Sequence, residues 1–401
     1  MFQTRLKTHH SAMADGNKYF MGPRNLVEVA STPQSVSAKD STIYIHIPFC
    51  SKICSFCNMR RSLSDPYKEY ADLIVREIEE YSKLPFVQSM VFDAVYFGGG
   101  TPTTLEAEDL KKILRALKAK FSFTEDAEFT IETTVTELSE EKLHMFYEEG
   151  VNRFSVGIQT FYDEGRAQLG RKGNGEYAYS KLRTIKDMGF QILSMDVIYN
   201  YPNQTLDILK GDLDKIIELD LDGFSMYSLI NMKETKIGVA GDAKLDEEMF
   251  YFIGEYMEAA GYSFLELTKM VKGDSYKYIM NRHRGGDTLP LGQGAGGSVN
   301  GLAMMNPIER TKYEETVINF SNRTGMYFNS DYKETVKFKG DIQTLYLPHN
   351  ETLYKDIDAY FALRDRLLLE EMIKKDKKGY RLTRKGIFWG NTLSRELSSL
   401  I

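Results

Sequence analysis

The sequence predicts an α/β fold in which a parallel sheet curls into a barrel, and three observations support this. From Ser41 onward, short apolar or β-branched segments alternate with amphipathic segments, which is the pattern of repeated βα units. Successive strands are spaced by roughly 25–45 residues, as βα units require. Gly, Pro, Asp or Asn bounds each strand. Right-handed crossovers would curl six such units into a partial or full barrel, and an open doubly wound sheet is the alternative.

The individual elements follow from local patterns. Strands are expected at residues 42–47, 90–97, 128–132, 152–156, 191–198 and 223–229, and helices at 66–83, 106–120, 139–149, 177–188 and 205–219. Ser139 is the expected N-cap of the third helix, because a serine side chain accepts a hydrogen bond from an amide of the first turn. After about residue 231 the alternation fades, although 246–260 has a helical pattern, 262–267 an extended one, and 285–301 is rich in glycine.

These patterns divide the chain into three parts. Residues 1–40 have no sustained period and are expected to form an irregular arm or lid. Residues 41–301 are expected to form the barrel and its extension. Residues 302–401 are expected to form a C-terminal domain that is mostly helical or winged-helix-like, because two charged helical segments flank residues 379–386.

Composition narrows the class of protein. The chain has 401 residues, a formal net charge of −6 and 3 cysteines. A net negative charge gives no general attraction for nucleic acid, so we expect no nucleic-acid partner. No apolar run approaches the roughly 18 residues that span a bilayer, and the polar, basic start lacks the apolar segment of a secretory signal. We therefore expect a cytoplasmic protein without a membrane span.

All three cysteines lie in one short loop after the first expected strand. Cys50, Cys54 and Cys57 have the spacing C-x3-C-x2-C, which suits a metal centre better than a disulfide framework. Structural zinc normally takes a fourth ligand, and the nearest histidine, His46, lies within the preceding strand. Three thiolates can instead hold a [4Fe–4S] cluster and leave one iron open. The alternative is that the three cysteines are small buried hydrophobic residues.

The segment Tyr44-Ile-His-Ile-Pro-Phe-Cys50, followed by Cys54 and Phe56-Cys57, resembles the signature of radical S-adenosylmethionine (SAM) enzymes. Within that superfamily it resembles the oxygen-independent coproporphyrinogen III oxidase-like (HemN-like) family. The resemblance implies a [4Fe–4S] cluster whose open iron binds the amino and carboxylate groups of SAM. The reduced cluster then cleaves SAM to methionine and a 5'-deoxyadenosyl radical. It also implies a radical SAM partial (β/α)6 barrel, a catalytic role for Tyr44, and an electron donor of the reduced flavodoxin or ferredoxin type.

The resemblance continues from residue 43 to 301, with polar groups at successive strand ends. It implies that SAM is contacted by Phe56, Gly99, Gly100, Thr101, Glu132, Gln159, Arg171 and Asp196. In the family, the position of Glu132 holds the SAM amino group, and the positions of Gln159 and Asp196 face the ribose. The guanidinium of Arg171 suits a carboxylate. The sequence departs from the family after Glu132, where Thr133 and Thr134 follow, and after Arg171, where Lys172 replaces the usual histidine.

Three further features favour one branch of the family. Met59 stands where the coproporphyrinogen enzymes carry a fourth cysteine, residues 1–40 precede the first strand as an arm, and residues 382–390 resemble the C-terminus of the anaerobic haem-utilisation branch, the HutW/ChuW-type proteins. That branch implies a C-methyltransferase that methylates and opens the porphyrin ring of haem, releasing iron. A haem chaperone (HemW-like) and an oxygen-independent coproporphyrinogen III dehydrogenase are the alternatives.

The expected substrate is haem or a related tetrapyrrole, which needs partners for its propionates and its iron. Candidate contacts are His9 and His10 in the arm, and Arg282 and His283 beside the glycine-rich segment. The absence of cysteine outside the loop excludes a methyl-cysteine intermediate and auxiliary clusters. A HemN-like methyltransferase avoids both by binding two SAM molecules, and whether one or two bind here is left open by the sequence.

Overall fold

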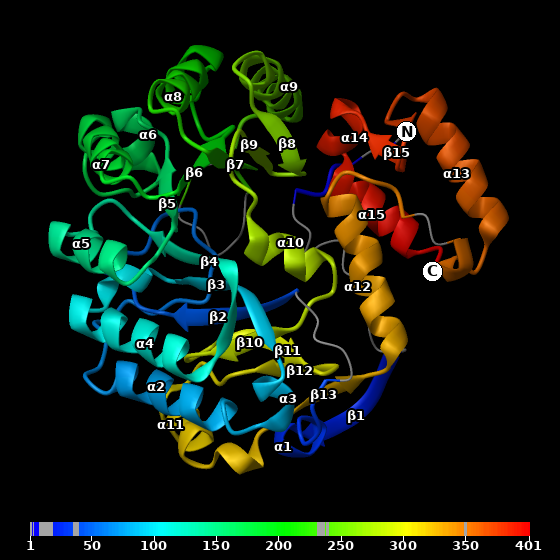
Figure 1. Ribbon diagram of the computed structural model, residues 1–401. Coiled ribbons are helices and arrows are strands. Elements are labelled where there is room, and N and C mark those ends of the chain that lie inside the picture. Colours follow the sequence, from blue (N-terminus) through cyan, green and yellow to red (C-terminus); the bar gives the residue numbers. More distant parts are fainter. Residues whose placement is uncertain are drawn as a thin grey trace.

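The computed structural model describes residues 2, 4–7, 19–34, 40–230, 237, 240–348 and 351–401. Its centre is a run of six parallel strands in chain order (Figure 1). They are β2 (Ser41–Ile47), β3 (Val91–Gly99), β4 (Ser122–Thr133), β5 (Arg153–Gln159), β6 (Ile192–Tyr199) and β7 (Gly223–Ser228). All six predicted strands are confirmed, although β4 begins earlier than expected. Most of their residues are buried, as expected for parallel strands covered on both faces.

Amphipathic helices cover the outer face of these strands (Figure 1). They are α2 (Tyr70–Tyr81), α4 (Ala107–Lys120), α5 (Glu140–Glu148), α7 (Gly175–Asp187) and α8 (Leu206–Glu218), with two short helices, α3 (Pro85–Gln88) and α6 (Asp163–Gln168), between them. In α4 the buried residues are Ala107, Leu110, Ile113, Leu114 and Leu117, which share one helical face. The side chain of Ser139 accepts a hydrogen bond from the Lys142 amide over 3.2 Å, so the predicted N-cap is confirmed.

The sheet continues beyond the six strands at both edges. Next to β2 lies the parallel strand β10 (Thr288–Leu291), followed by the antiparallel strands β11 (Gly296–Val299), β12 (Leu302–Met305), β13 (Thr324–Phe328) and β1 (Phe20–Asn25). Next to β7 lie β9 (Lys269–Val271) and β8 (Ser263–Glu266). In the part of the chain that the structure describes, β1 and β8 end this sheet, so the barrel is open. The predicted partial (β/α)6 barrel is confirmed.

Two of these extensions were not expected. Residues 20–25 were expected to be irregular, but they form β1 because they pair with β13, with Pro23 opposite Met326. Such a distant partner leaves no local signal. In β10, Pro290 lies beside Tyr44 of β2, and a proline inside a short apolar segment argues against a strand. The glycine-rich segment 285–301 therefore supplies β10 and β11 in addition to turns.

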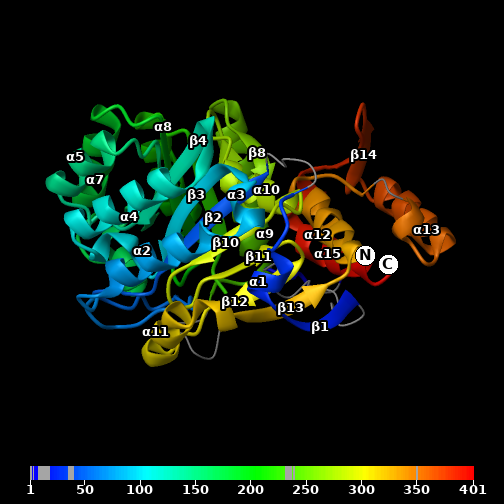
Figure 2. The same cartoon turned by 60° about the horizontal axis from the view of Figure 1, so that its bottom comes forward.

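The C-terminal residues form a separate layer beside the open side of the barrel (Figures 1 and 2). Its elements are α12 (Ser330–Gln343), α13 (Ile357–Leu369), the hairpin β14 (Ile373–Asp376) and β15 (Gly379–Leu382), α14 (Arg384–Phe388) and α15 (Gly390–Ser398). Helix α11 (Arg310–Ile318) connects β12 to β13 and lies beside α2. Helices α9 (Ala243–Ala259) and α10 (Lys277–His283) lie between the C-terminal layer and the barrel. No helix in the described ranges has the length and hydropathy of a membrane span.

The N-terminus joins the C-terminal layer to the barrel. Arg5 donates a hydrogen bond to the carbonyl oxygen of Phe388 over 2.7 Å and another to Asp246 of α9 over 2.7 Å. Phe2 packs on Trp389 with ring centroids 5.6 Å apart. The large sheet also contains strands from all three predicted parts of the chain. The boundaries at residues 40 and 301 remain a prediction.

Candidate functional site

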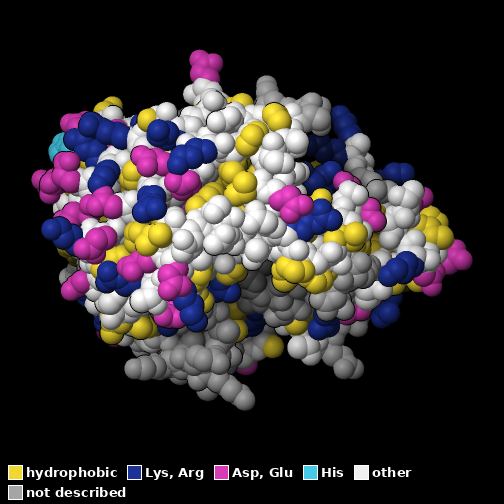
Figure 3. Space-filling model, turned by 90° about the horizontal axis from the view of Figure 1, so that it is seen from below, with side chains coloured by type: hydrophobic (Ala, Val, Ile, Leu, Met, Phe, Trp, Pro, Cys, Tyr) yellow, Lys and Arg dark blue, Asp and Glu magenta, His cyan; other side chains and the backbone are white. Residues whose placement is uncertain are grey.

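A cavity of about 1200 Å³ lies at the C-terminal ends of the parallel strands. This is larger than the roughly 300–1,000 Å³ of a usual small-molecule site. Its lining comes from the cysteine loop, the ends of β3 to β7, helix α10 and the C-terminal helices α12, α14 and α15. Figure 3 shows the surface hollowed between the barrel and the C-terminal layer, with hydrophobic side chains at the rim. The site can therefore hold more than one ligand or one large ligand.

The three cysteines line one side of this cavity as free thiols. The loop is held in place because the Cys50 amide donates to the carbonyl oxygen of Ser62 over 3.0 Å and the Cys57 amide to that of Cys54 over 3.2 Å. Burial raises the pKa of Cys50 and of Cys57. A bound metal centre would stabilise the thiolates that burial disfavours.

The spacing of the cysteines distinguishes between kinds of metal centre. In the described ranges, no three His, Cys, Asp or Glu side chains converge closely enough to hold a single metal ion. A tetrahedral zinc ion would need its thiolates at about 2.3 Å from one point. The irons of a [4Fe–4S] cluster each take one thiolate, so the cysteines surround a space rather than a point. The described residues therefore show no site for a single zinc ion, and three cysteines are the number that anchors a [4Fe–4S] cluster with one open iron.

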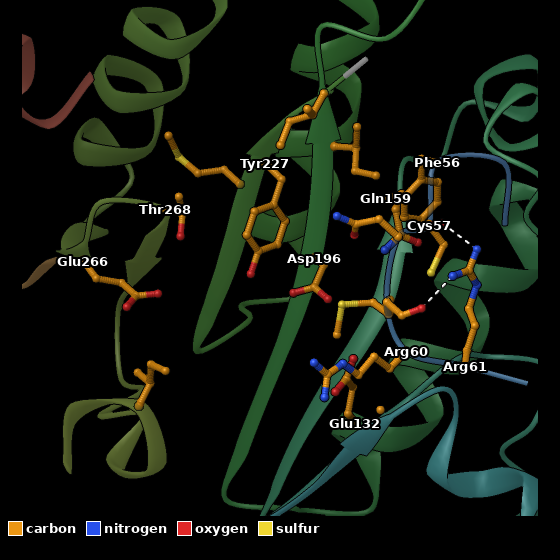
Figure 4. A pocket seen from close by; sticks show the side chains of 18 of the residues that line it. Phe56, Cys57, Arg60, Arg61, Glu132, Gln159, Asp196, Tyr227, Glu266 and Thr268 are labelled. Carbon is orange, nitrogen blue, oxygen red and sulfur yellow. Dashed lines mark hydrogen bonds between the residues drawn. The ribbon is translucent and has the colours of Figure 1, made fainter. Parts of the chain in front are cut away.

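Two half-buried carboxylates face this cavity, Glu132 at the end of β4 and Asp196 in β6 (Figure 4). Burial, and then the charge of Asp196, raise the pKa of Glu132 to about 8, although hydrogen bonds from Tyr96 and the Gly99 amide oppose the shift. Burial also raises the pKa of Asp196. A cationic ligand would stabilise the charged form of both carboxylates, as the ammonium and sulfonium groups of SAM would.

Gln159 and Arg171 present unused polar atoms to the same space. Gln159 has a left-handed backbone, with φ of 69°, a strained conformation that is concentrated at functional sites. Its Oε1 and the Nε of Arg171 are buried without a hydrogen-bond partner among the described residues. Buried polar atoms are rarely left unpaired. Both side chains are therefore consistent with contacts to a polar ligand.

The glycine segment at the end of β3 is bonded through its backbone to the residues that lead into the cysteine loop. The Gly100 amide donates to the carbonyl oxygen of Ile47 and the Thr101 amide to that of Phe49, both over 2.8 Å. A side chain at Gly100 would lie 2.6 Å from the Phe49 carbonyl oxygen. The segment thus anchors the backbone just before the cysteine loop. Gly99, Gly100 and Thr101 still line the cavity, and their contact with SAM remains a prediction.

Tyr44 lies in a smaller cavity of about 360 Å³ that shares Glu132 and Asp196 with the larger one. Its hydroxyl is 2.8 Å from Nδ1 of His46, and burial raises its pKa well above the usual range. Other tyrosines line the same space: Tyr96, Tyr227, Tyr276 and Tyr278. Sequence reasoning missed this cluster. Tyr276 is the N-cap of α10 and Tyr278 lies in its first turn, so neither is marked by a strand pattern. Only the alternation of β3 could have placed Tyr96 on the face of Tyr44.

Among the other predicted contacts, Phe56 lines the large cavity. Arg282 lines both cavities and donates from Nη1 to the Tyr278 hydroxyl over 3.1 Å. Nε2 of His283 is 3.1 Å from Oε2 of Glu266, and both side chains line the large cavity. His9 and His10 lie outside the described residues.

Comparisons with known proteins bear on the family and the fold of this chain. The model of the Radical SAM superfamily matches residues 44–216. Anaerobilin synthase of Escherichia coli O157:H7 is 28% identical over 385 residues, 92% of this chain and 86% of that protein. Heme chaperone HemW of Bacillus subtilis is 30% identical over 275 residues, 66% of this chain and 72% of that protein. Among solved structures, coproporphyrinogen III oxidase of Escherichia coli has the same fold, with a TM-score of 0.77 and 22% identity over 93% of this chain and 92% of that one.

Proposed function

Since this chain belongs to the radical SAM superfamily, we propose that it degrades haem anaerobically as a C-methyltransferase, methylating and opening the porphyrin ring and releasing the iron. Proteins of this superfamily use a [4Fe–4S] cluster and SAM. The observation that carries the proposal is the similarity to anaerobilin synthase, which extends over 92% of this chain. A bilin is an open-chain tetrapyrrole, so that name implies ring opening.

The residues around the cavity divide between the two cofactors. Cys50, Cys54 and Cys57 would hold the cluster, and Glu132 would take the SAM ammonium group. Gln159 and Asp196 would accept hydrogen bonds from the ribose hydroxyls of SAM. Arg171 would pair with the carboxylate of SAM. When bound, the cluster and SAM supply a one-electron reduction and a carbon-centred radical. The protein contributes position, charge and exclusion of water.

The cysteine count restricts the route that methylation could take. A methyl group carried on a protein thiol would need a cysteine outside the cluster, and all 3 cysteines of the chain lie between residues 50 and 57. The methyl group would therefore pass directly from SAM to the ring. The cavity of about 1200 Å³ has room for SAM beside a tetrapyrrole. Whether a second SAM molecule binds, and whether a flavodoxin- or ferredoxin-type protein reduces the cluster, remain predictions.

Two other functions have specific support. The 30% identity to Heme chaperone HemW favours a protein that binds haem and delivers it unchanged. The fold shared with coproporphyrinogen III oxidase favours dehydrogenation of coproporphyrinogen. Met59 argues against the second, because it lines both cavities where the coproporphyrinogen enzymes carry a cysteine.

One anaerobic assay separates the three functions. The reconstituted protein is incubated with reductant, SAM and haem, and the Soret absorbance, 5'-deoxyadenosine and S-adenosylhomocysteine are followed. Haem degradation predicts loss of the Soret band together with both SAM products. A stable Soret band without SAM turnover would indicate a chaperone. SAM turnover that requires coproporphyrinogen in place of haem would indicate the dehydrogenase.

A further inference from the structure

We propose that the C-terminal side of the large cavity is a slot for a planar tetrapyrrole, in which Lys339 pairs with a propionate carboxylate. This inference rests on the proposed function and locates its substrate. The slot has three walls: a face of strands β11 and β12, one side of helix α12, and the end of helix α10. All three line the cavity, and Figure 4 shows Glu266, the partner of His283 in α10, across the cavity from Cys57.

The first wall is a surface of small side chains. Strands β11 and β12 pair Ser298 with Ala303 and Gly296 with Met305, and residues at alternate positions of paired strands share a face. All four line the cavity. Serine and alanine leave the backbone close to the surface at Ser298 and Ala303, so the wall is flat there, and the Met305 side chain lies over Gly296, where an added Cβ would be 3.0 Å from its terminal methyl group. A flat wall of this kind is suited to the face of an aromatic macrocycle.

The second wall is one stripe of helix α12. The residues of α12 that line the cavity are Tyr332, Val336, Lys339, Gly340 and Gln343. Their spacing follows the helical period, so they lie on one side of the helix. Tyr332, whose ring stacks on Phe328 with centroids 4.2 Å apart, and Val336 form the apolar part of this stripe, whereas Lys339 and Gln343 form its polar part. An amphipathic ligand with an apolar ring and carboxylates at one edge matches this order.

Lys339 is the cation in this wall whose charge is not already paired. No hydrogen bond or ion pair joins its Nζ to another described residue, it is half-buried, and burial lowers its pKa. By contrast, Arg5 and Lys7, which also line the cavity, both pair with Asp246, over 2.7 and 3.1 Å. A buried cation is stabilised by an anion. A ligand carboxylate beside Lys339 supplies that anion.

Helix α10 connects the slot to the SAM candidates. Ile279, Arg282 and His283 line the large cavity, and Arg282 also lines the smaller cavity that contains Tyr44 and Glu132. A side chain at Gly340 of α12 would lie 2.0 Å from the His283 carbonyl oxygen, so the two helices are in close contact there. A ring seated beside α12 is therefore adjacent to the space that SAM would occupy.

Binding of metal-free protoporphyrin IX, without SAM or reductant, tests the slot. The probe is added to the full chain and its affinity is measured by porphyrin fluorescence, with protoporphyrin IX dimethyl ester as the uncharged comparison. Lys339→Gln should weaken the diacid about tenfold, the usual range for a charged hydrogen bond, and should leave the diester unchanged. Lys337→Gln is the matched control, because Lys337 on the same helix is exposed and paired with Glu334.

A substitution in the flat wall tests the shape of the slot. Ala303→Leu should weaken the diacid and the diester equally, with circular dichroism confirming that the variant is folded. The slot would be overturned if Lys339→Gln bound the diacid with wild-type affinity. It would also be overturned if this variant lost the same factor in affinity for the diacid and for the diester. Because no turnover is measured, the result is separate from the proposed function: porphyrin binding with this pattern but without haem degradation would retain the slot and reject the enzyme.

Discussion

Nη1 of Arg171 donates a hydrogen bond to Sγ of Cys54 over 3.1 Å. The same guanidinium donates through Nη2 to the carbonyl oxygen of Gly157 in β5. Arg171 therefore joins the cysteine loop to the barrel and lies between the residues proposed for the cluster and those proposed for SAM. Its Nε, without a partner in the described part of the chain, is available to a ligand carboxylate.

Arg171→Met should lower the affinity for SAM about tenfold, because the loss of one charge-assisted hydrogen bond has that size. Equilibrium dialysis with the reconstituted protein measures the affinity, and iron analysis normalises it to cluster content. Lys172→Met is the control, since the Lys172 ammonium is partly exposed and contacts Ser51 over 2.8 Å. Equal SAM affinity of wild type and Arg171→Met would remove Arg171 from the cofactor site.

Cys54→Ala should abolish assembly of the [4Fe–4S] cluster, because two thiolates leave two irons without protein ligands. Iron and sulfide analysis after anaerobic reconstitution measures this directly. Ser51→Ala, in the same loop, should assemble the cluster normally. A stoichiometric cluster in Cys54→Ala would show that the cysteine loop is not its ligand set.

The Glu132 carboxyl should make the stability of the ligand-free protein fall with rising pH. Its pKa is raised from 4.5 to about 8 in the folded chain, so between these values the unfolded state binds fewer protons and the free energy of unfolding decreases as pH rises. Thermal unfolding from pH 5 to 9 should show a smaller decrease in Glu132→Gln, which does not titrate. Parallel curves for wild type and variant would contradict the assigned pKa.

Asp274→Asn should destabilise the fold by about 3–5 kcal/mol, the usual cost of breaking a buried ion pair. Asp274 accepts hydrogen bonds from Arg153 over 2.7 and 3.0 Å and lies 3.2 Å from the Lys269 ammonium, all three being buried. Denaturant unfolding measures the loss. The exposed pair Lys272 and Asp220 gives the control, since Asp220→Asn should cost less than about 1 kcal/mol.

The sequence was sufficient for the parallel strands and for the residues at their ends. The strands are apolar segments at regular spacing, and the polar residue near the C-terminal end of each one, such as Glu132 in β4, must lie at a common edge of the sheet. This is why the structure brings Glu132, Gln159 and Asp196 into one cavity with the cysteines. The roles of these residues toward SAM remain proposals.

The features that were missed depend on contacts between distant segments. Strand β1 exists because Pro23 lies opposite Met326. The tyrosine cluster exists because the start of α10, with Tyr276 and Tyr278, packs on Tyr96. The proposed role of Lys339 also depends on such contacts. In sequence it is one of several lysines in α12, and only the packing of that helix on the cavity distinguishes it from Lys337.

The most direct test of haem degradation by methylation is mass spectrometry of the tetrapyrrole formed from haem and SAM that is deuterated in its methyl group, under anaerobic reducing conditions. The proposed function predicts an open-chain tetrapyrrole that contains the deuterated methyl group, together with free iron. Recovery of intact, unlabelled haem from a protein with a complete cluster and an active reductant would contradict it.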